Sequence, residues 1–432
     1  MAFFLFILVN ATLFIRPAEL VPALAGAPIY NVLIIACLAA SLPALLKQMA
    51  LRRLMEQPIS ACVIGILIAG VLSQLARADL LLARTWGFEF FKVVLYYFLL
   101  IAILDSPGRL RSFLTWLAIF TILLTGLGLI HYHGIANIPA LKALERVEGY
   151  NEQTGEPIIE LQLVSTGIFN DPNDLCLILV VGIMISAHRL VERHSGPARL
   201  LWLAPIGMFT YALVLTRSRG GFLSLLASLL ALFVVRFGWR KSIPLAIGVL
   251  PAMFLLSGGR QTRLSTSEGT AQERIELWKA GLHRLLRSPL TGIGVGRYAE
   301  ENEWGLVAHN SYVHANVELG IAGGACFLGA FSVPLWSLRR LGSRQVEILD
   351  PDLKTLRPFL VAMVVGYATG LFSISRCYIV PTYMLPGLVT AYLRVTAINP
   401  AQAPPKVDGR FIRQIMILDF LFLILIRIIF IR

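Results

Sequence analysis

The feature that most constrains this chain is a series of apolar runs, most of them about as long as helices that cross a lipid bilayer. Hydrophobic residues make up 57% of the 432 residues and charged residues only 15%, against roughly a quarter charged in soluble domains. Because backbone polar groups inside a bilayer must be satisfied within each segment, we expect the runs to be helices. They predict an all-α polytopic integral membrane protein with about twelve transmembrane helices. Their approximate bounds are residues 2–15, 29–46, 58–76, 88–104, 112–131, 172–188, 200–216, 220–235, 242–257, 311–336, 358–375 and 379–393.

Basic residues gather on alternate connections between these runs and account for the net charge of +13. By the positive-inside rule these connections are cytoplasmic, which predicts that both termini are cytoplasmic as well. We take the first run as a span, because it lacks the basic segment and small-residue cleavage site of a signal peptide. The charge therefore has a topological use, and we expect no nucleic-acid partner. These connections carry Lys47, Arg52, Arg53, Arg109, Arg111, Arg189, Arg193, Arg199, Arg236, Arg240, Lys241, Arg339, Arg340, Arg344, Lys354, Arg357, Arg394, Lys406, Arg410 and Arg413.

Two long connections fall on the opposite, outer side, at about residues 131–171 and 258–308. The first is acidic and ends in a helix start, since Asp171 suits the N-cap and Pro172 the first helical position. In the second, Thr270 and Glu273 have the spacing of a capping box. Apolar residues then recur at helical spacing, which predicts an amphipathic helix along the outer membrane surface. These residues are Ile275, Trp278, Leu282, Leu285 and Leu286.

Two arginines, Arg217 and Arg219, interrupt the apolar stretch at residues 200–235. As one helix this stretch would be about 54 Å long, so the chain must turn back near its middle. The turn places both guanidinium groups at the outer membrane face, where the positive-inside rule disfavours them. These arginines either snorkel, pair with Glu or Asp of the acidic loop, or form an anion site, and the planar guanidinium group suits phosphate.

The segment at residues 308–324 opens the tenth apolar run with several polar residues. If it is helical, Asn316, Gly320 and Gly323 share one face with His309, and the glycines permit close approach of a neighbouring helix. His314 and Glu318 are four residues apart on another face and are expected to form a structural pair. At the outer rim of this face, His309 is a candidate acid or base.

The remaining segments are less specific. Residues 292–296, with three glycines, have no preceding strand and indicate flexible backbone near a ligand or a turn. The five cysteines lie in or at the ends of apolar runs, so neither a disulfide framework nor a zinc site is expected. We expect one polytopic domain over residues 1–398, followed at 399–432 by a linker and an apolar tail. Asp419 leaves open whether the tail is a further span or an interfacial helix.

Several of these segments resemble the O-antigen ligase and O-antigen polymerase superfamily. The resemblance rests on residues 215–221, 274–278 and 292–296, and on His309-Asn310 followed after nine residues by Gly320 and then Gly323. It implies a ligase-like core at about 167–336. It also implies a glycosyltransferase, without metal or other cofactor, that acts at the periplasmic face of the bacterial inner membrane. The implied partners are an undecaprenyl-pyrophosphate-linked glycan donor, a glycan or lipid A-core acceptor, and membrane lipids.

The resemblance also implies roles for individual residues. Arg219 and Arg274 would bind the pyrophosphate, and His309 would act as general base on the acceptor hydroxyl. The choice of Arg274 stays open, because Arg260, Arg263, Arg284 and Arg297 share its loop. The residues expected to contact substrate are Arg217, Asn310, Asn173 and Arg297.

The alternatives within and outside the superfamily stay open at this point. Gly324 and Ala325 stand where ligases often carry hydroxyl or amide residues, so a ligase, a polysaccharide polymerase and a protein O-glycosylating oligosaccharyltransferase are not distinguished. A transporter or flippase should carry ionisable residues near the bilayer midplane. Only Glu89 and Lys92 come near this requirement, close to the outer end of a span, which favours glycosyl transfer.

Overall fold

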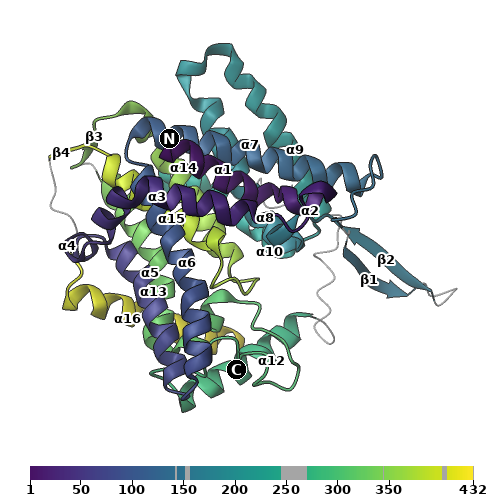
Figure 1. Ribbon diagram of the computed structural model, residues 1–432, viewed down its shortest axis with the longest axis vertical. Helices are drawn as coiled ribbons and strands as arrows, with labels where there is room; N and C mark the ends of the chain where they lie inside the picture. Colours follow the sequence, from purple (N-terminus) through teal and green to yellow (C-terminus); the bar gives the residue numbers. More distant parts are fainter. Residues whose placement is uncertain (142–143, 151–155, 245–269, 344, 401–405, 432) are drawn as a thin grey trace. The chain divides into compact units, whose positions relative to one another are not determined.

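The computed structural model describes residues 1–141, 144–150, 156–244, 270–343, 345–400 and 406–431, and most of these residues are helical (Figure 1). Contacts divide the chain into two compact units. Unit 1 comprises Met1–Ala40, Gly108–Arg263 and Thr355–Gly370, and unit 2 comprises Ser41–Pro107, Leu264–Lys354 and Leu371–Arg432. The candidate residues are therefore described unit by unit.

Eight helices of the described residues are long and apolar enough to cross a membrane, which confirms an all-α polytopic membrane protein. They are α3 (Ile29–Met49), α5 (Pro58–Leu75), α6 (Leu80–Ile103), α7 (Pro107–Tyr132), α8 (Pro172–Val191), residues 196–215, α10 (Arg219–Phe237) and α13 (Ser311–Leu341). The first apolar run forms a shorter helix, α1 (Ala2–Ile15), and most of the run at 242–257 lies outside the described residues. The total of twelve spans therefore stays a prediction.

The other elements are shorter or more polar. The helices are α2 (Pro17–Leu20), η1 (Pro22–Leu24), α4 (Leu51–Met55), η2 (Gly167–Phe169), η3 (Arg193–Trp202), α9 (Leu203–Leu215), α12 (Thr270–Arg287), α14 (Pro351–Gly370), α15 (Val380–Val395) and α16 (Gly409–Phe430). The strands are β1 (Leu144–Tyr150), β2 (Pro157–Gln162), β3 (Glu347–Ile348) and β4 (Ile398–Asn399). Strands β1 and β2 pair antiparallel within the acidic connection, where the sequence predicted only a loop.

In unit 1, α8 packs against α9 and α10, and small polar side chains join α10 to α14. The hydroxyl of Ser224 donates to the carbonyl of Gly366 at 2.7 Å, and that of Ser228 to the carbonyl of Ala362 at 2.8 Å. Hydroxyl groups that bond a neighbouring helix are a common means of helix association inside membranes. This packing fixes the beginning of α10, which carries the arginine turn.

In unit 2, α13 packs against α5, α12, α15 and α16. Small residues bring α5 and α13 close together: a Cβ atom at Gly65 would lie 2.5 Å from the Cys326 sulfur, and one at Gly323 would lie 3.0 Å from the Ala69 Cβ atom. The expectation that Gly323 permits close helix approach is therefore confirmed.

The apolar tail forms α16, which packs along α13. The backbone N–H of Val407, just before α16, donates to the carbonyl of Met55 at 2.8 Å. The last residue of α16, Phe430, contacts Trp278 of α12 with ring centroids 5.2 Å apart. Helix α16 thus runs from the beginning of α5 to α12, but it is not among the eight helices of the described residues that are long and apolar enough to cross a membrane. The cytoplasmic placement of both termini stays a prediction.

The ends of the unit 2 helices fall into two groups that agree with the alternation of charge in the sequence. The beginning of α5 and the ends of α13 and α15, all next to basic connections, line one pocket. At the other end of α5, the Arg77 side chain donates to the carbonyl of Gly292 at 3.2 Å. The second group therefore includes part of the connection predicted to be periplasmic.

Candidate functional site

The chain turns between α9 and α10 at the position that the sequence predicted. Arg217 adopts a left-handed backbone conformation, with φ of +55°, which is uncommon for a residue other than glycine. Ser218 is the N-cap of α10, and its hydroxyl accepts the N–H of Gly221 at 3.0 Å. Arg219 is therefore the first residue of α10.

A direct hydrogen bond links this turn to the beginning of α8. The Ser218 hydroxyl donates to the Asn173 side-chain oxygen at 2.6 Å. Asn173 is itself held by the predicted N-cap, because its backbone N–H donates to the Asp171 carboxylate at 2.8 Å. Gly221 packs on Cys176, whose sulfur would lie 2.3 Å from a Cβ atom at that position. Asn173, expected to bind substrate, thus holds the arginine turn in place.

The charge on Arg219 is poorly compensated within the described residues. Its side chain is exposed and forms no hydrogen bond or ion pair with any residue that the structure describes. A cation at the first position of a helix also faces the positive end of the helix dipole. Pairing with the described side chains of the acidic connection therefore does not account for Arg219, and a bound anion would stabilise both the arginine and the helix N-terminus.

In unit 2, His309 lies just before Asn310, the N-cap of α13, and is half-buried. Its backbone is also left-handed, with φ of +48°, and only four described residues other than glycine have positive φ. Asn310 is the fully buried N-cap, and its side-chain oxygen accepts the N–H groups of Tyr312 and Val313 at 3.0 and 3.2 Å. The Asn310 side-chain nitrogen is buried and has no hydrogen-bond partner among the described residues, which is uncommon for a buried polar group.

The single helical face expected to carry His309, Asn316 and two glycines is wrong. Helix α13 begins at Ser311 and is kinked at Gly320, where φ is +74° and ψ is 177°. A Cβ atom at Gly320 would lie 2.4 Å from the carbonyl oxygen of Leu290, so this glycine admits a loop and not a helix. A Cβ atom at Gly292 would likewise lie 2.6 Å from the nitrogen of Gly320. Residues 290–292 therefore pack directly on the kink.

Sequence reasoning missed the role of Glu318 in holding this loop. Its buried carboxylate accepts the N–H groups of Gly296 and Tyr298 at 3.0 and 3.2 Å, and the Tyr378 hydroxyl donates to it at 2.9 Å. His314 contacts it at 3.0 Å, which confirms the predicted pair. One carboxylate thus joins α13 to the glycine-rich segment and to residue 378, and only contacts distant in sequence reveal this.

Helix α12 brings Arg274 into the neighbourhood of residue 308. The Trp278 ring nitrogen, one turn after Arg274, donates to the carbonyl of Ala308 at 2.7 Å. The buried face of α12 contains Leu277, Trp278 and Leu285, whereas Leu286, expected on this face, is 69% exposed. Helix α12 therefore packs on α13 and does not only lie on a membrane. The side chain of Thr270 lies outside the described residues.

Two of the other loop arginines are held in ion pairs. Arg284 pairs with Glu301, and Arg297 pairs with Asp79 at 3.0 Å. Asp79 in turn caps α6 by accepting the N–H of Leu82 at 2.9 Å. Arg297 therefore joins two segments of unit 2, which argues against its expected contact with substrate. Arg260 and Arg263 lie outside the described residues.

Within unit 1 the structure brings together Asn173, Arg217 and Arg219, and within unit 2 it places Arg274 near the segment of His309 and Asn310. Residues 204–328, which include all of these except Asn173, match the family model described as O-antigen ligase. No curated protein matches the chain.

Proposed function

From the match of residues 204–328 to the family model described as O-antigen ligase, we propose that this membrane protein transfers a glycan from undecaprenyl pyrophosphate to an acceptor hydroxyl. The reaction takes place at the periplasmic face of the bacterial inner membrane, during assembly of lipopolysaccharide or another surface polysaccharide. The donor, the acceptor and the membrane side are parts of this proposal.

The observation that carries the proposal is Arg219 at the beginning of α10. An exposed arginine without a described partner, next to Arg217 at a helix N-terminus, forms an anion site of the kind that phosphate groups occupy. The leaving group of the proposed reaction is a pyrophosphate, on which negative charge increases as the glycosidic bond breaks. Guanidinium groups held at this point would stabilise the transition state more than the ground state.

The proton of the acceptor needs a base, and we assign this role to His309. The acceptor oxygen attacks the anomeric carbon, the bond to the pyrophosphate oxygen breaks, and the hydroxyl proton passes to the imidazole. The left-handed backbone of His309 supports the assignment, because strain in a residue other than glycine is concentrated at functional sites. Arg274 is kept as a second pyrophosphate ligand, because α12 brings it near the segment of His309 through the bond of Trp278 to Ala308.

The experiment uses the purified full chain, a lipid-linked glycan and either lipid A-core or further donor as acceptor. Arg219→Lys should lose about 100-fold or more in turnover, because a single ammonium group cannot replace the planar guanidinium group. Arg236→Lys, at the other end of α10, should leave turnover unchanged. Near-normal turnover in Arg219→Lys would contradict the anion role. Product formed only with lipid A-core would identify a ligase, and product formed from donor alone a polymerase.

The same assay separates the role of His309 from a structural one. His309→Gln and His309→Ala should both abolish transfer, while binding of the lipid-linked donor stays within about threefold. His283→Gln, an exposed histidine on α12, is the matched control and should remain active. Activity in His309→Gln, or loss of donor binding in both variants, would move the base to another residue.

A further inference from the structure

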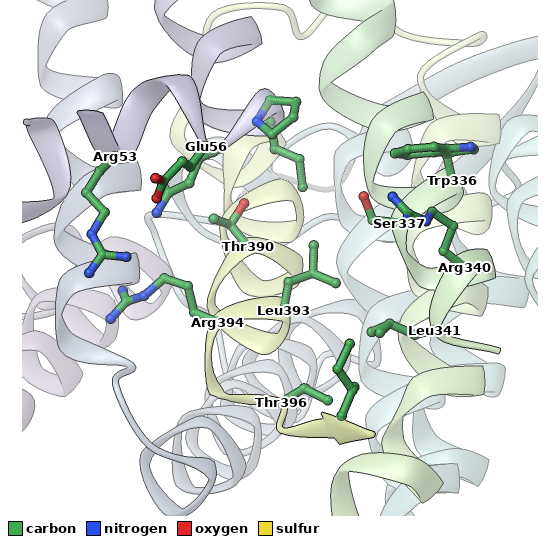
Figure 2. Close-up of a pocket in the computed structure, with 14 residues that line it drawn as sticks. Arg53, Glu56, Trp336, Ser337, Arg340, Leu341, Thr390, Leu393, Arg394 and Thr396 are labelled. Carbon is green, nitrogen blue, oxygen red and sulfur yellow. The ribbon is translucent and has the colours of Figure 1, made fainter. Parts of the chain in front are cut away.

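A pocket of about 360 Å³ lies at the end of unit 2 where α5 begins and α13 and α15 end (Figure 2). This volume is within the range of small-molecule sites. Arg53, Glu56 and Arg394 lie on one side of the view and Trp336 and Arg340 on the other. None of these residues belongs to the candidate site described above.

The pocket collects positive charge from three separate segments of the chain. Arg53 comes from α4, Arg340 from the end of α13 and Arg394 from the end of α15. Glu56 is the only carboxylate among the residues that line the pocket. It also pairs at 3.8 Å with Arg52, which is not one of the lining residues. Even with Asp105, which attracts Arg394 from outside the lining, basic groups remain in excess.

Two of the three guanidinium groups are close enough to repel each other. The charge of Arg53 acts unfavourably on Arg394, and Figure 2 shows the two groups on the same side of the pocket. Arg394 is held there by a hydrogen bond of 2.5 Å to the carbonyl of Ile101. A fixed arginine next to a second one is a preformed site for an anion, because an anion between them converts repulsion into attraction.

The remaining wall is apolar and typical of a membrane interface. The guanidinium group of Arg340 lies over the ring of Trp336, 5.1 Å from the centroid, and Trp336 is half exposed. Leu393 and Ile59 also line the pocket. Tryptophan is enriched where a membrane helix reaches the headgroups, so this wall is suited to the glycerol and upper acyl chain of a lipid.

We propose that this pocket binds the phosphate group of an anionic phospholipid, with Arg53, Arg340 and Arg394 around the phosphate. Basic pockets between membrane helices at the cytoplasmic side are suited to such headgroups. The adjoining connections are the basic ones that the positive-inside rule assigns to the cytoplasm. The inference does not depend on the proposed glycosyl transfer.

The chain offers a closely matched pair of double variants. Arg53→Gln with Arg340→Gln removes two charges from the pocket. Arg52→Gln with Arg339→Gln removes two charges from the same segments, but neither residue lines the pocket. A third variant, Leu341→Trp, fills the pocket without changing its charge. It tests the same site if the pocket double variant fails to fold.

Binding is measured by native mass spectrometry of the full chain in detergent micelles. The probes are short-chain phosphatidylglycerol, short-chain phosphatidylcholine and inorganic phosphate. We expect phosphatidylglycerol to bind more tightly than the other two. The pocket double variant should weaken it about 30-fold and the control double variant less than about threefold, because headgroup attraction falls with each basic residue removed. Leu341→Trp should also weaken it.

Equal weakening in the two double variants would overturn the inference, because the effect would then be general surface charge. Equal affinity for phosphatidylcholine would overturn it as well. If inorganic phosphate competes as strongly as phosphatidylglycerol binds, the site takes free phosphate and the lipid assignment is wrong. Thermal unfolding of each variant in the same detergent shows whether loss of binding reflects loss of structure.

Discussion

Replacing Glu318 tests how strongly one buried carboxylate holds the glycine-rich segment on α13. Glu318→Ala leaves the N–H groups of Gly296 and Tyr298, the Tyr378 hydroxyl and the His314 ring without their acceptor. Hydrogen bonds to a charged group contribute about 1.5–3 kcal/mol each, which would give about 6–12 kcal/mol for four if the contributions were additive. Because neighbouring losses are not additive and water can enter, we expect a cost of about 3–5 kcal/mol.

The assay is equilibrium unfolding in mixed detergent micelles, followed by tryptophan fluorescence. Glu318→Gln should cost about half as much as Glu318→Ala, since the amide oxygen can still accept the two backbone N–H groups. Glu303→Ala, an exposed residue of the same connection, should change the free energy of unfolding by less than about 0.5 kcal/mol. A cost for Glu318→Ala no larger than that of Glu303→Ala would refute the reasoning.

Two further predictions concern topology and the last helix. Glu303→Cys should react with a membrane-impermeant thiol reagent in intact spheroplasts, and Ser343→Cys should react only after lysis. The reason is that we expect these two exposed positions to lie on opposite sides of the membrane. The reverse pattern would mean that the predicted topology is inverted. Asp419→Asn should change the free energy of unfolding by no more than about 1 kcal/mol. In the parent chain the Asn316 side-chain N–H donates to Asp419 at 2.9 Å, and the new asparagine can still accept this bond while it gains a donor for the Asn316 oxygen. Asp419→Leu should cost about 1–3 kcal/mol in the same unfolding assay, and equal stability of the two variants would show that the pair contributes nothing.

The parts of the structure that sequence predicted are those set by local rules. The Asp171 cap, the turn at Arg217 and the pair of His314 with Glu318 depend on residues a few positions apart, and all three are present. The run lengths likewise indicated membrane helices, because hydrocarbon thickness dictates helix length.

The parts that sequence did not predict depend on contacts between distant residues. Helical periodicity assumes an unbroken helix, so it could not reveal the kink at Gly320. This kink depends on packing between Gly320 and residues 290–292. The placement of α16 follows from the bond between Asn316 and Asp419, which are far apart in sequence. In the candidate site, the sequence could offer several loop arginines but could not show that Arg284 and Arg297 have carboxylate partners.

The left-handed backbone at Arg217 and His309 has a consequence for engineering this chain. A residue other than glycine in that conformation costs of order 1 kcal/mol or more, and the helices that follow these two residues supply the compensation. A redesign that rewards only resistance to heat would replace both with glycine or asparagine, and would gain stability at each step. Under the roles proposed for these two residues, the same substitutions would remove an anion ligand and the general base, so stability would rise while activity is lost.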